Sequence, residues 1–174
     1  MYIGIDLGTS GVKVILMAED GNVVASCSSP LSVSRPFDLW SEQTPEDWWQ
    51  ATDLAMLQLA AENDLQGVKA IGLSGQMHGA TLLNKKGDVL RPAILWNDGR
   101  SHEECLLLQR RCPEVQAITG NLVMPGFTAP KLLWVKQHEP EIFGQIAKVL
   151  LPKDYLRFRM TGEFATDVSD ASGT

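Results

Sequence analysis

The chain has 174 residues, 44% of them hydrophobic and 21% charged, which is the composition of a globular domain and excludes a disordered, collagen-like or coiled-coil segment. Its 15 basic and 21 acidic residues give a net charge of −6, which argues against a nucleic-acid partner. The N-terminus has no basic segment followed by an apolar one, and no run of about 18 apolar residues occurs, so we expect a cytoplasmic protein without membrane association.

The first predicted element is a β-hairpin. Aliphatic and β-branched residues typical of a buried sheet occupy 3–7 and 12–16, and the turn between them reads Gly-Thr-Ser-Gly. Gly8 and Gly11 are expected to adopt backbone conformations closed to other residues and to bring backbone N–H groups close to an anion. An ordinary glycine-containing hairpin is the alternative interpretation.

Asp6 stands at the bend of this hairpin. A carboxylate repels phosphate unless a divalent cation lies between them, and Mg²⁺ binds with one or two carboxylates, water and substrate phosphates. Thr9 and Ser10 add hydroxyl donors, and Lys13 adds a positive charge. The chain has neither the P-loop pattern nor a G-x-G-x-x-G turn. The hairpin instead resembles the first motif of the sugar kinase, Hsp70 and actin superfamily.

The next elements predict the fold class. A third strand over 23–27 is followed by a helix that begins at the N-cap Thr44, with Asp47 completing an approximate capping box, and ends near Asn63. Its predicted buried stripe consists of Trp48, Thr52, Ala55, Met56, Leu59 and Ala60. Three antiparallel strands, a helix and then strand-helix alternation indicate an α/β domain with a mixed sheet. This order resembles a ribonuclease-H-like, actin-like ATPase lobe.

The rest of the chain continues the alternation. Strands are predicted over 68–74, 80–83, 148–151 and 164–166, with a short extended segment ending at 95–98. Helices are predicted over 101–111, 129–137, 140–146 and 152–160. The last strand has neither partner nor cap, so we expect the chain to stop within a domain.

Polar residues follow the strand over 68–74, where open α/β sheets place their ligands. Gln76 and His78 can donate and accept hydrogen bonds, and Met77 offers an adaptable apolar wall, which together suit a polyol. The alternative is a turn in which His78 caps a neighbouring carbonyl.

A second polar group lies at 96–100. Trp96 can stack on the apolar face of a sugar ring. Asp98 and Arg100 can either hydrogen-bond hydroxyl groups or pair with each other, and the sequence does not decide between these roles.

Several motifs in order now give a specific resemblance. They are Asp6-Leu7-Gly8-Thr9-Ser10, Gly75-Gln76-Met77-His78-Gly79, Trp96-Asn97-Asp98-Gly99-Arg100, Thr119-Gly120-Asn121, Pro125-Gly126-Phe127-Thr128-Ala129-Pro130-Lys131-Leu132 and Leu151-Pro152-Lys153-Asp154-Tyr155. Across its whole length the chain resembles the FGGY family of carbohydrate kinases. The resemblance implies ATP-dependent phosphorylation of D-xylulose to D-xylulose 5-phosphate.

The resemblance also implies roles for residues. Asp6 is the acidic residue near Mg²⁺ and the transferred phosphoryl group, and the turn 8–10 with Lys13 faces the ATP phosphates. Met77 and His78 contact the sugar. Related glycerol kinases carry Arg-Glu at these two positions, so the pair bears on which polyol is accepted. A homodimer is compatible with the family, and the sequence does not fix the oligomeric state.

One departure limits these implications. The family's general base is an Asp in a later Gly-rich segment, and its adenosine site lies mostly in a second lobe, so we expect residues 1–174 to be an incomplete first lobe that is inactive in isolation. An actin-like or Hsp70-like nucleotide switch remains an alternative that explains the hairpin but not the motifs at 76–78 and 96–100. An FGGY kinase for another polyol and a sugar-binding regulator without catalysis are further alternatives.

Overall fold

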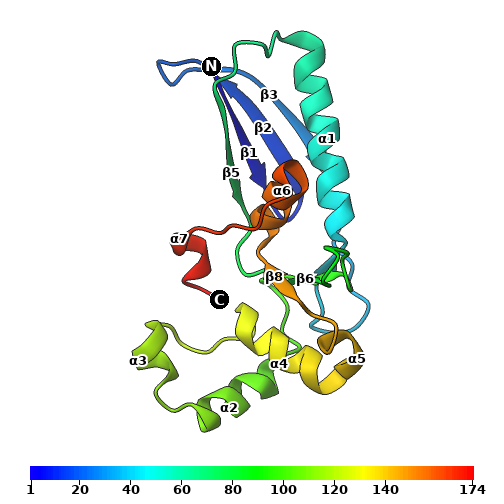
Figure 1. Ribbon diagram of the computed structural model, residues 1–174, viewed down its shortest axis with the longest axis vertical. Coiled ribbons are helices and arrows are strands. Elements are labelled where there is room, and N and C mark those ends of the chain that lie inside the picture. Colours follow the sequence, from blue (N-terminus) through cyan, green and yellow to red (C-terminus); the bar gives the residue numbers. More distant parts are fainter.

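The computed structural model describes residues 1–174. The strands are β1 (Tyr2–Leu7), β2 (Gly11–Met17), β3 (Val23–Pro30), β4 (Glu42–Gln43), β5 (Ala70–Gly75), β6 (Thr81–Leu83), β7 (Ala93–Ile94) and β8 (Lys148–Leu150). The helices are α1 (Pro45–Glu62), α2 (His102–Arg111), α3 (Val115–Thr119), α4 (Thr128–His138), α5 (Pro140–Phe143), α6 (Pro152–Thr161) and α7 (Val168–Ala171). A sheet with one long helix forms one end of the molecule, and α2 to α5 form the other (Figure 1).

The main sheet has the strand order β3-β2-β1-β5. Strand β2 pairs antiparallel with β1 and β3, whereas β5 pairs parallel with β1, so the predicted mixed sheet with three antiparallel strands first is confirmed. The register places Asp6 of β1 opposite Lys13 of β2 and Ser74 of β5. The end of β1 therefore brings the predicted metal ligand next to two neighbouring strands.

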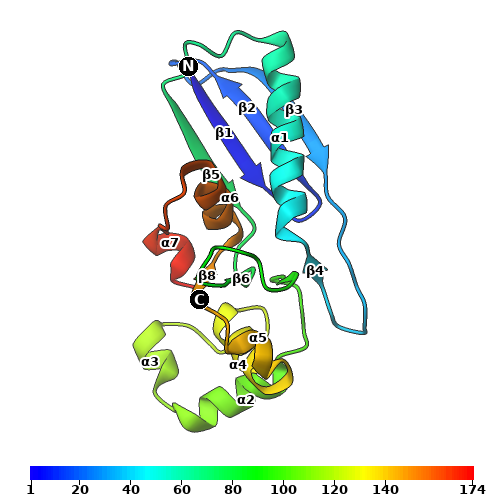
Figure 2. The same ribbon diagram turned by 45° about the vertical axis from the view of Figure 1, so that its right-hand side comes forward.

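Helix α1 lies along one face of this sheet (Figure 2). Alternate residues of β1 and β2 are buried because strand side chains alternate between the two faces. They share one hydrophobic core with Trp48, Ala55 and Leu59 of α1, as the predicted stripe requires. Ala60 is exposed and Met56 only half-buried, so the buried stripe is narrower than predicted.

The four remaining strands do not extend the main sheet. They form two separate two-stranded sheets, β4 with β7 and β6 with β8. Leu82 and Ile94 of these strands pack with Trp134 and Val135 of α4 in a second core cluster. The expected strand-helix alternation is therefore present in order, but its later strands are short and do not join the main sheet.

Some local details differ from the predictions. Thr44 is the N-cap of α1, as predicted, but its side chain makes no cap hydrogen bond, and the Asp47 amide donates to the Thr44 carbonyl at 3.0 Å, so the capping box is not formed. Residues 164–166 are not a strand, since they lead into α7, whose N-cap Asp167 accepts from two backbone amides. Helix α3, in a predominantly exposed segment, was not predicted. No helix has the length and apolar character needed to cross a membrane.

Candidate functional site

The Asp6 carboxylate is exposed at the end of β1 and has no hydrogen bond or ion pair in the structure. It lines a groove of about 530 Å³ together with Lys13 and Ser74. Sheet hydrogen bonds hold the backbone on both sides of Asp6, because β1 pairs with β2 and with β5. A rigid backbone thus presents an unpaired carboxylate and an ammonium group to the same groove.

The hairpin turn needs glycine for a different reason from the one predicted. Gly8 and Gly11 do not have positive φ angles. A Cβ at Gly11 would instead lie 2.8 Å from the carbonyl oxygen of Ser29, closer than a side chain tolerates. Close packing of β3 against the turn therefore explains the glycine, while Ser10 remains exposed beside Lys13 in a second, smaller groove.

The Thr9 hydroxyl connects the hairpin to the next strand end. Its Oγ1 donates to Gln76 Oε1 at 3.0 Å and accepts from Trp96 Nε1 at 3.0 Å. Thr9, which was predicted to face the ATP phosphates, is thereby hydrogen-bonded to Gln76 and Trp96, which were predicted to bind the sugar. The single hydroxyl proton of Thr9 is directed at Gln76 in this structure, so Thr9 links the hairpin turn to the end of β5.

Gln43, which the sequence analysis did not single out, completes this network. Its Oε1 accepts from Gln76 Nε2 and from Trp48 Nε1, both at 2.9 Å, and its Nε2 donates to the Thr9 carbonyl at 2.7 Å. Gln43 is almost fully buried, as is Gln76. The position of Gln76 is therefore determined by buried amide hydrogen bonds that anchor it to helix α1 and to the hairpin.

A cleft of about 680 Å³ opens beyond the end of β5, and Met77 and His78 both line it. Met77 is 51% exposed and contributes an apolar side chain to the lining of the cleft. Leu73 and Ser74 line this cleft and also the Asp6 groove, so the two hollows open on either side of the same strand end. Neither Gln76 nor Trp96 lines the cleft.

His78 is held against the wall of the cleft. Its ring packs edge-on against Phe127, with the centroids 4.6 Å apart. Burial lowers the pKa of His78 below its usual value, the positive charge of Lys131 lowers it further, and Asp170 acts in the opposite direction. The imidazole is therefore neutral at pH 7 and can both donate and accept a hydrogen bond, which suits a sugar hydroxyl.

Lys153 also lines the cleft and lies among three carboxylates. Its Nζ is 2.7 Å from Asp154, 2.8 Å from Asp167 and 3.0 Å from Asp170. Burial alone lowers the pKa of Lys153, but the hydrogen bonds to these carboxylates outweigh it and raise the pKa above its usual value. The hydrogen bond from Lys153 in turn lowers the pKa of Asp167 to about 2. Lys153 therefore links α7 to α6 where both helices line the cleft.

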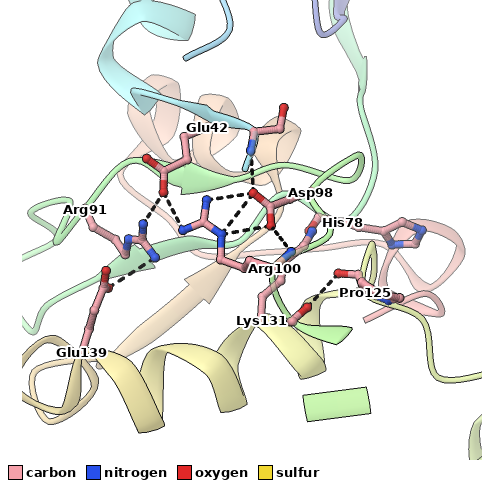
Figure 3. A network of polar contacts seen from close by, with 10 residues as sticks. Glu42, His78, Arg91, Asp98, Arg100, Pro125, Lys131 and Glu139 are labelled. Carbon is pink, nitrogen blue, oxygen red and sulfur yellow. Dashed lines mark hydrogen bonds and ion pairs between the residues drawn. The ribbon is translucent and has the colours of Figure 1, made fainter. Parts of the chain in front are cut away.

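Asp98 pairs with Arg100, one of the two roles that the sequence left open. Arg100 Nη2 lies 2.8 Å from Asp98 Oδ2, and the Ser41 amide donates to the same oxygen at 2.6 Å. The Asp98 side chain has no exposed area. Figure 3 shows the carboxylate turned into this network. Asp98 thus has no free surface for a sugar, which corrects its assignment as a substrate-binding residue.

The network around Arg100 extends across the second core. Arg100 Nη1 also lies 2.8 Å from Glu42, which pairs with Arg91 as well (Figure 3). The Arg100 guanidinium stacks 3.6 Å from the ring centre of Trp40. Charges buried in this way are paired and hydrogen-bonded, as their loss of hydration requires.

The ligands available at Asp6 fit a Mg²⁺ ion that is already bound to a phosphate group. The structure has no group of three or more His, Cys, Asp and Glu that could enclose a metal ion. A single free carboxylate facing an open groove supplies one ligand, and Mg²⁺ commonly takes its others from water and substrate phosphates.

A family model described as the N-terminal domain of the FGGY family of carbohydrate kinases matches residues 1–174. The chain belongs to the FGGY family of carbohydrate kinases. This confirms the resemblance drawn from the ordered motifs. The alternative that the hairpin belongs to an actin-like or Hsp70-like nucleotide switch accordingly loses its support.

Relatives of this FGGY chain extend the comparison. The xylulose kinase of Escherichia coli (strain K12) is 71% identical over 174 residues, which are the whole chain and 36% of that protein. The solved structure of a xyloylose kinase from Brucella ovis has a TM-score of 0.97 at 54% identity, covering 99% of this chain and 37% of that one. Gluconate kinase from Lactobacillus acidophilus has a TM-score of 0.93 at 30% identity, covering 99% and 35%. These relatives confirm the predicted fold class.

The quoted FGGY motifs contain fewer than half of the residues that line the cleft, and none of those from 167–173. Phe127, Lys131 and Lys153 lie in the quoted segments, but only their positions in the structure distinguish a lining residue from a structural one. Gln43 had no comparable signal, because a glutamine before a helix is unremarkable. The chain spans about a third of the length of the relatives it matches.

Proposed function

We propose that the protein carrying this chain phosphorylates D-xylulose with ATP to give D-xylulose 5-phosphate. One observation carries the proposal: the cleft lined by Met77 and His78 and the groove lined by Asp6 and Lys13 share the end of β5. A sugar hydroxyl in the cleft and a phosphoryl group in the groove would therefore meet at this strand end. The similarity to xylulose kinases supports D-xylulose as the sugar.

The residues of the chain divide the work of phosphoryl transfer between them. His78, neutral and able to donate and accept, binds and orients sugar hydroxyls, and Met77 packs against the carbon skeleton. Lys13 attracts the phosphate charge, and exposed Ser10 adds a hydroxyl donor beside it. Asp6 would hold Mg²⁺, which supplies charge neutralisation on the transferred phosphoryl group. Positioning and electrostatics are the main sources of catalysis in this reaction class.

Buried contacts keep these groups in place. Thr9, Gln76 and Gln43 lock the hairpin to the end of β5, so the distance between groove and cleft is fixed by hydrogen bonds and not by flexible loops. Trp96, half-exposed and bonded to Thr9, stands at this junction. In the proposed enzyme it shields the transfer from water.

No residue of this chain is proposed as the general base. The base and the adenosine site belong to a part of the enzyme beyond these 174 residues, and the chain is its incomplete first lobe. The carboxylates of Asp167 and Asp170 are both paired with Lys153, so they do not substitute for the base. We accordingly expect the chain alone not to release ADP in the presence of D-xylulose.

A kinase for another polyol is the second candidate, because gluconate kinase from Lactobacillus acidophilus has the same fold in this region. The Met77-His78 pair favours D-xylulose over glycerol, since the resemblance to the family places Arg-Glu there in glycerol kinases. The two candidates differ only in the sugar that the cleft accepts.

The decisive experiment is an ADP-release assay on the intact protein with D-xylulose, ribulose, fuculose, gluconate and glycerol. We expect kcat/KM for D-xylulose to exceed that for every other sugar by at least about tenfold, which corresponds to about 1.4 kcal/mol of transition-state discrimination. Equal values for D-xylulose and gluconate would contradict the proposal. Sugar binding without turnover would instead support the regulator.

A further inference from the structure

The backbone of His78 has an unusual conformation. Its φ angle is 60°, in the left-handed region, and Leu39 is the only other residue besides glycine with positive φ. A residue with a Cβ pays a free-energy cost there, so the surrounding structure must hold it. This conformation determines the direction in which the imidazole leaves the chain, and the imidazole lines the cleft.

Two side chains of α4 hold the carbonyl group of His78. Lys131 Nζ donates to this oxygen at 2.7 Å, and Thr128 Oγ1 donates to it at 3.2 Å. Lys131 and Thr128 are both fully buried, with 0% exposure. A fully buried ammonium with a backbone carbonyl as its hydrogen-bond partner is costly, which makes this contact stand out among the polar contacts of the chain.

We infer that Lys131 is a positioning residue for sugar binding: it grips the His78 carbonyl, holds the left-handed backbone and so aims the imidazole into the cleft. The inference rests on the proposed function for the identity of the sugar. Lys131 itself does not line the cleft and touches no substrate in this arrangement. Figure 3 shows the imidazole of His78 directed away from the Asp98-Arg100 pair.

The charge state of Lys131 adds a pH dependence. Burial lowers the pKa of Lys131 to about 7, with Asp98 acting to raise it and Arg100 to lower it further. Below that pH the ammonium makes a charge-assisted hydrogen bond to the His78 carbonyl, and above it a neutral amine makes a weaker one. Sugar affinity should therefore fall as pH rises through about 7.

Two glutamates near α4 each have a basic partner away from Lys131. Glu104 of α2 lies 3.4 Å from His138, and Glu139 before α5 lies 3.3 Å from Arg91. These pairs involve the C-terminal part of α4 and the residue after it, whereas Lys131 is in its first turns. The imidazole of His78 titrates on the acid side of its usual pKa, so the interval from pH 7 to 8.5 isolates Lys131.

The test measures D-xylulose binding to the intact protein without nucleotide, by calorimetry, and turnover separately. We expect Lys131→Met to raise the Kd about tenfold while kcat at saturating sugar stays within about threefold, because a hydrogen bond to a charged group is lost. Lys136→Met, on the exposed side of the same helix, is the matched control and should leave both quantities unchanged. A Kd rise below twofold in Lys131→Met overturns the inference.

A double-mutant cycle separates positioning from general support of the fold. In a His78→Ala background, Lys131→Met should raise the Kd less than twofold, because the imidazole that it aims is gone. A full tenfold rise in that background overturns the inference. The wild-type Kd should also rise between pH 7 and 8.5, and this rise should be absent in Lys131→Met.

Two further measurements cover the remaining cases. If Lys131→Met does not fold, Thr128→Val removes the second donor at nearly constant volume and should raise the Kd about threefold; no change overturns the inference. If the wild-type protein neither binds nor phosphorylates D-xylulose, the proposed function fails by itself. The inference is then read from ¹⁵N shifts of the His78 imidazole, whose pKa should rise in Lys131→Met, and an unchanged pKa overturns it.

Discussion

The two hollows at the end of β5 are built in opposite ways. On the Asp6 side, paired strands hold the backbone and the side chain is free of any partner. On the His78 side, the backbone lies outside regular structure, and side chains from α4, 50 and 53 residues further along the chain, hold it. The first hollow is determined by local sequence and the second by long-range contacts.

This difference separates two tasks. A phosphate-binding corner needs a carboxylate that stays available to a cation, so it is left unpaired on a rigid sheet. A sugar cleft needs side chains aimed in fixed directions, so its loop is constrained by buried hydrogen bonds. Substitutions on the two sides should therefore change different kinetic constants.

The largest expected effect is at the corner. Asp6→Ala in the intact enzyme should lower kcat by about 10³-fold or more while the KM for D-xylulose changes little, because the carboxylate acts on the transferred group and not on the sugar. Steady-state kinetics at saturating ATP measure both constants. Asp53→Ala, an exposed carboxylate on α1, is the control. A kcat within a few fold of wild type for Asp6→Ala would rule out the metal-bridging role.

The next effect is on stability and concerns the support of the second hollow. Asp98→Ala should lower the free energy of unfolding by about 3–5 kcal/mol, because it leaves the buried Arg100 without one of its partners. Urea unfolding followed by tryptophan fluorescence reports it, since Trp40 stacks on Arg100. Glu62→Ala, exposed at the end of α1, should change it by less than about 0.5 kcal/mol. A loss below about 1 kcal/mol at Asp98 would contradict the buried pair.

A smaller effect is expected at His78 itself. His78→Ala should raise the KM for D-xylulose about tenfold and lower kcat less, because in the proposed enzyme the imidazole binds sugar hydroxyls in ground and transition states alike. His138→Ala, an exposed imidazole at the end of α4, provides the comparison and should leave KM unaltered. If kcat fell as much as after Asp6→Ala, the division of tasks between the two hollows would be wrong.

The smallest effect is a pH dependence of stability. The pKa of Lys131 is lowered from 10.5 to about 7 in the folded chain, so between these values the unfolded chain binds more protons than the folded one. The free energy of unfolding should therefore rise with pH over this interval, by at most about 1.4 kcal/mol per pH unit. Unfolding curves at pH 7, 8 and 9 test this, and Lys131→Met should lack the increase. An identical slope in both proteins would place the lowered pKa elsewhere.

Sequence patterns predicted the elements with strong local signals. The hairpin around Asp6, helix α1 and the order of three antiparallel strands all follow from alternation, helical spacing and turn residues close together in the chain. The family was predicted from motifs in their order. Helix α3 was not predicted, and residues 164–166 were wrongly predicted to form a strand, because short exposed segments have almost no hydrophobic periodicity.

The roles of polar side chains were harder to predict. From the sequence, Asp98 could bind a sugar or pair with Arg100. The structure decides for the buried pair, because the Ser41 amide donates to Asp98 and Glu42 pairs with Arg100. Thr9 and Gln76 were read as ligands of two different substrates, yet they hydrogen-bond each other across 67 positions of sequence.

The sequence by itself determined the family, the mixed sheet and the position of Asp6 at the hairpin, because each depends on neighbours within a few residues or on a motif that can be read directly. Only the tertiary structure decided which polar groups are used up in holding the fold and which stay available to a ligand. A hydrogen bond between distant segments leaves no pattern in the local sequence. The residue type does not help either, because the same type of polar side chain can hold the fold or bind a ligand. The left-handed His78 under Lys131 is such a case, where α4 sets the geometry of a loop far from it in the chain.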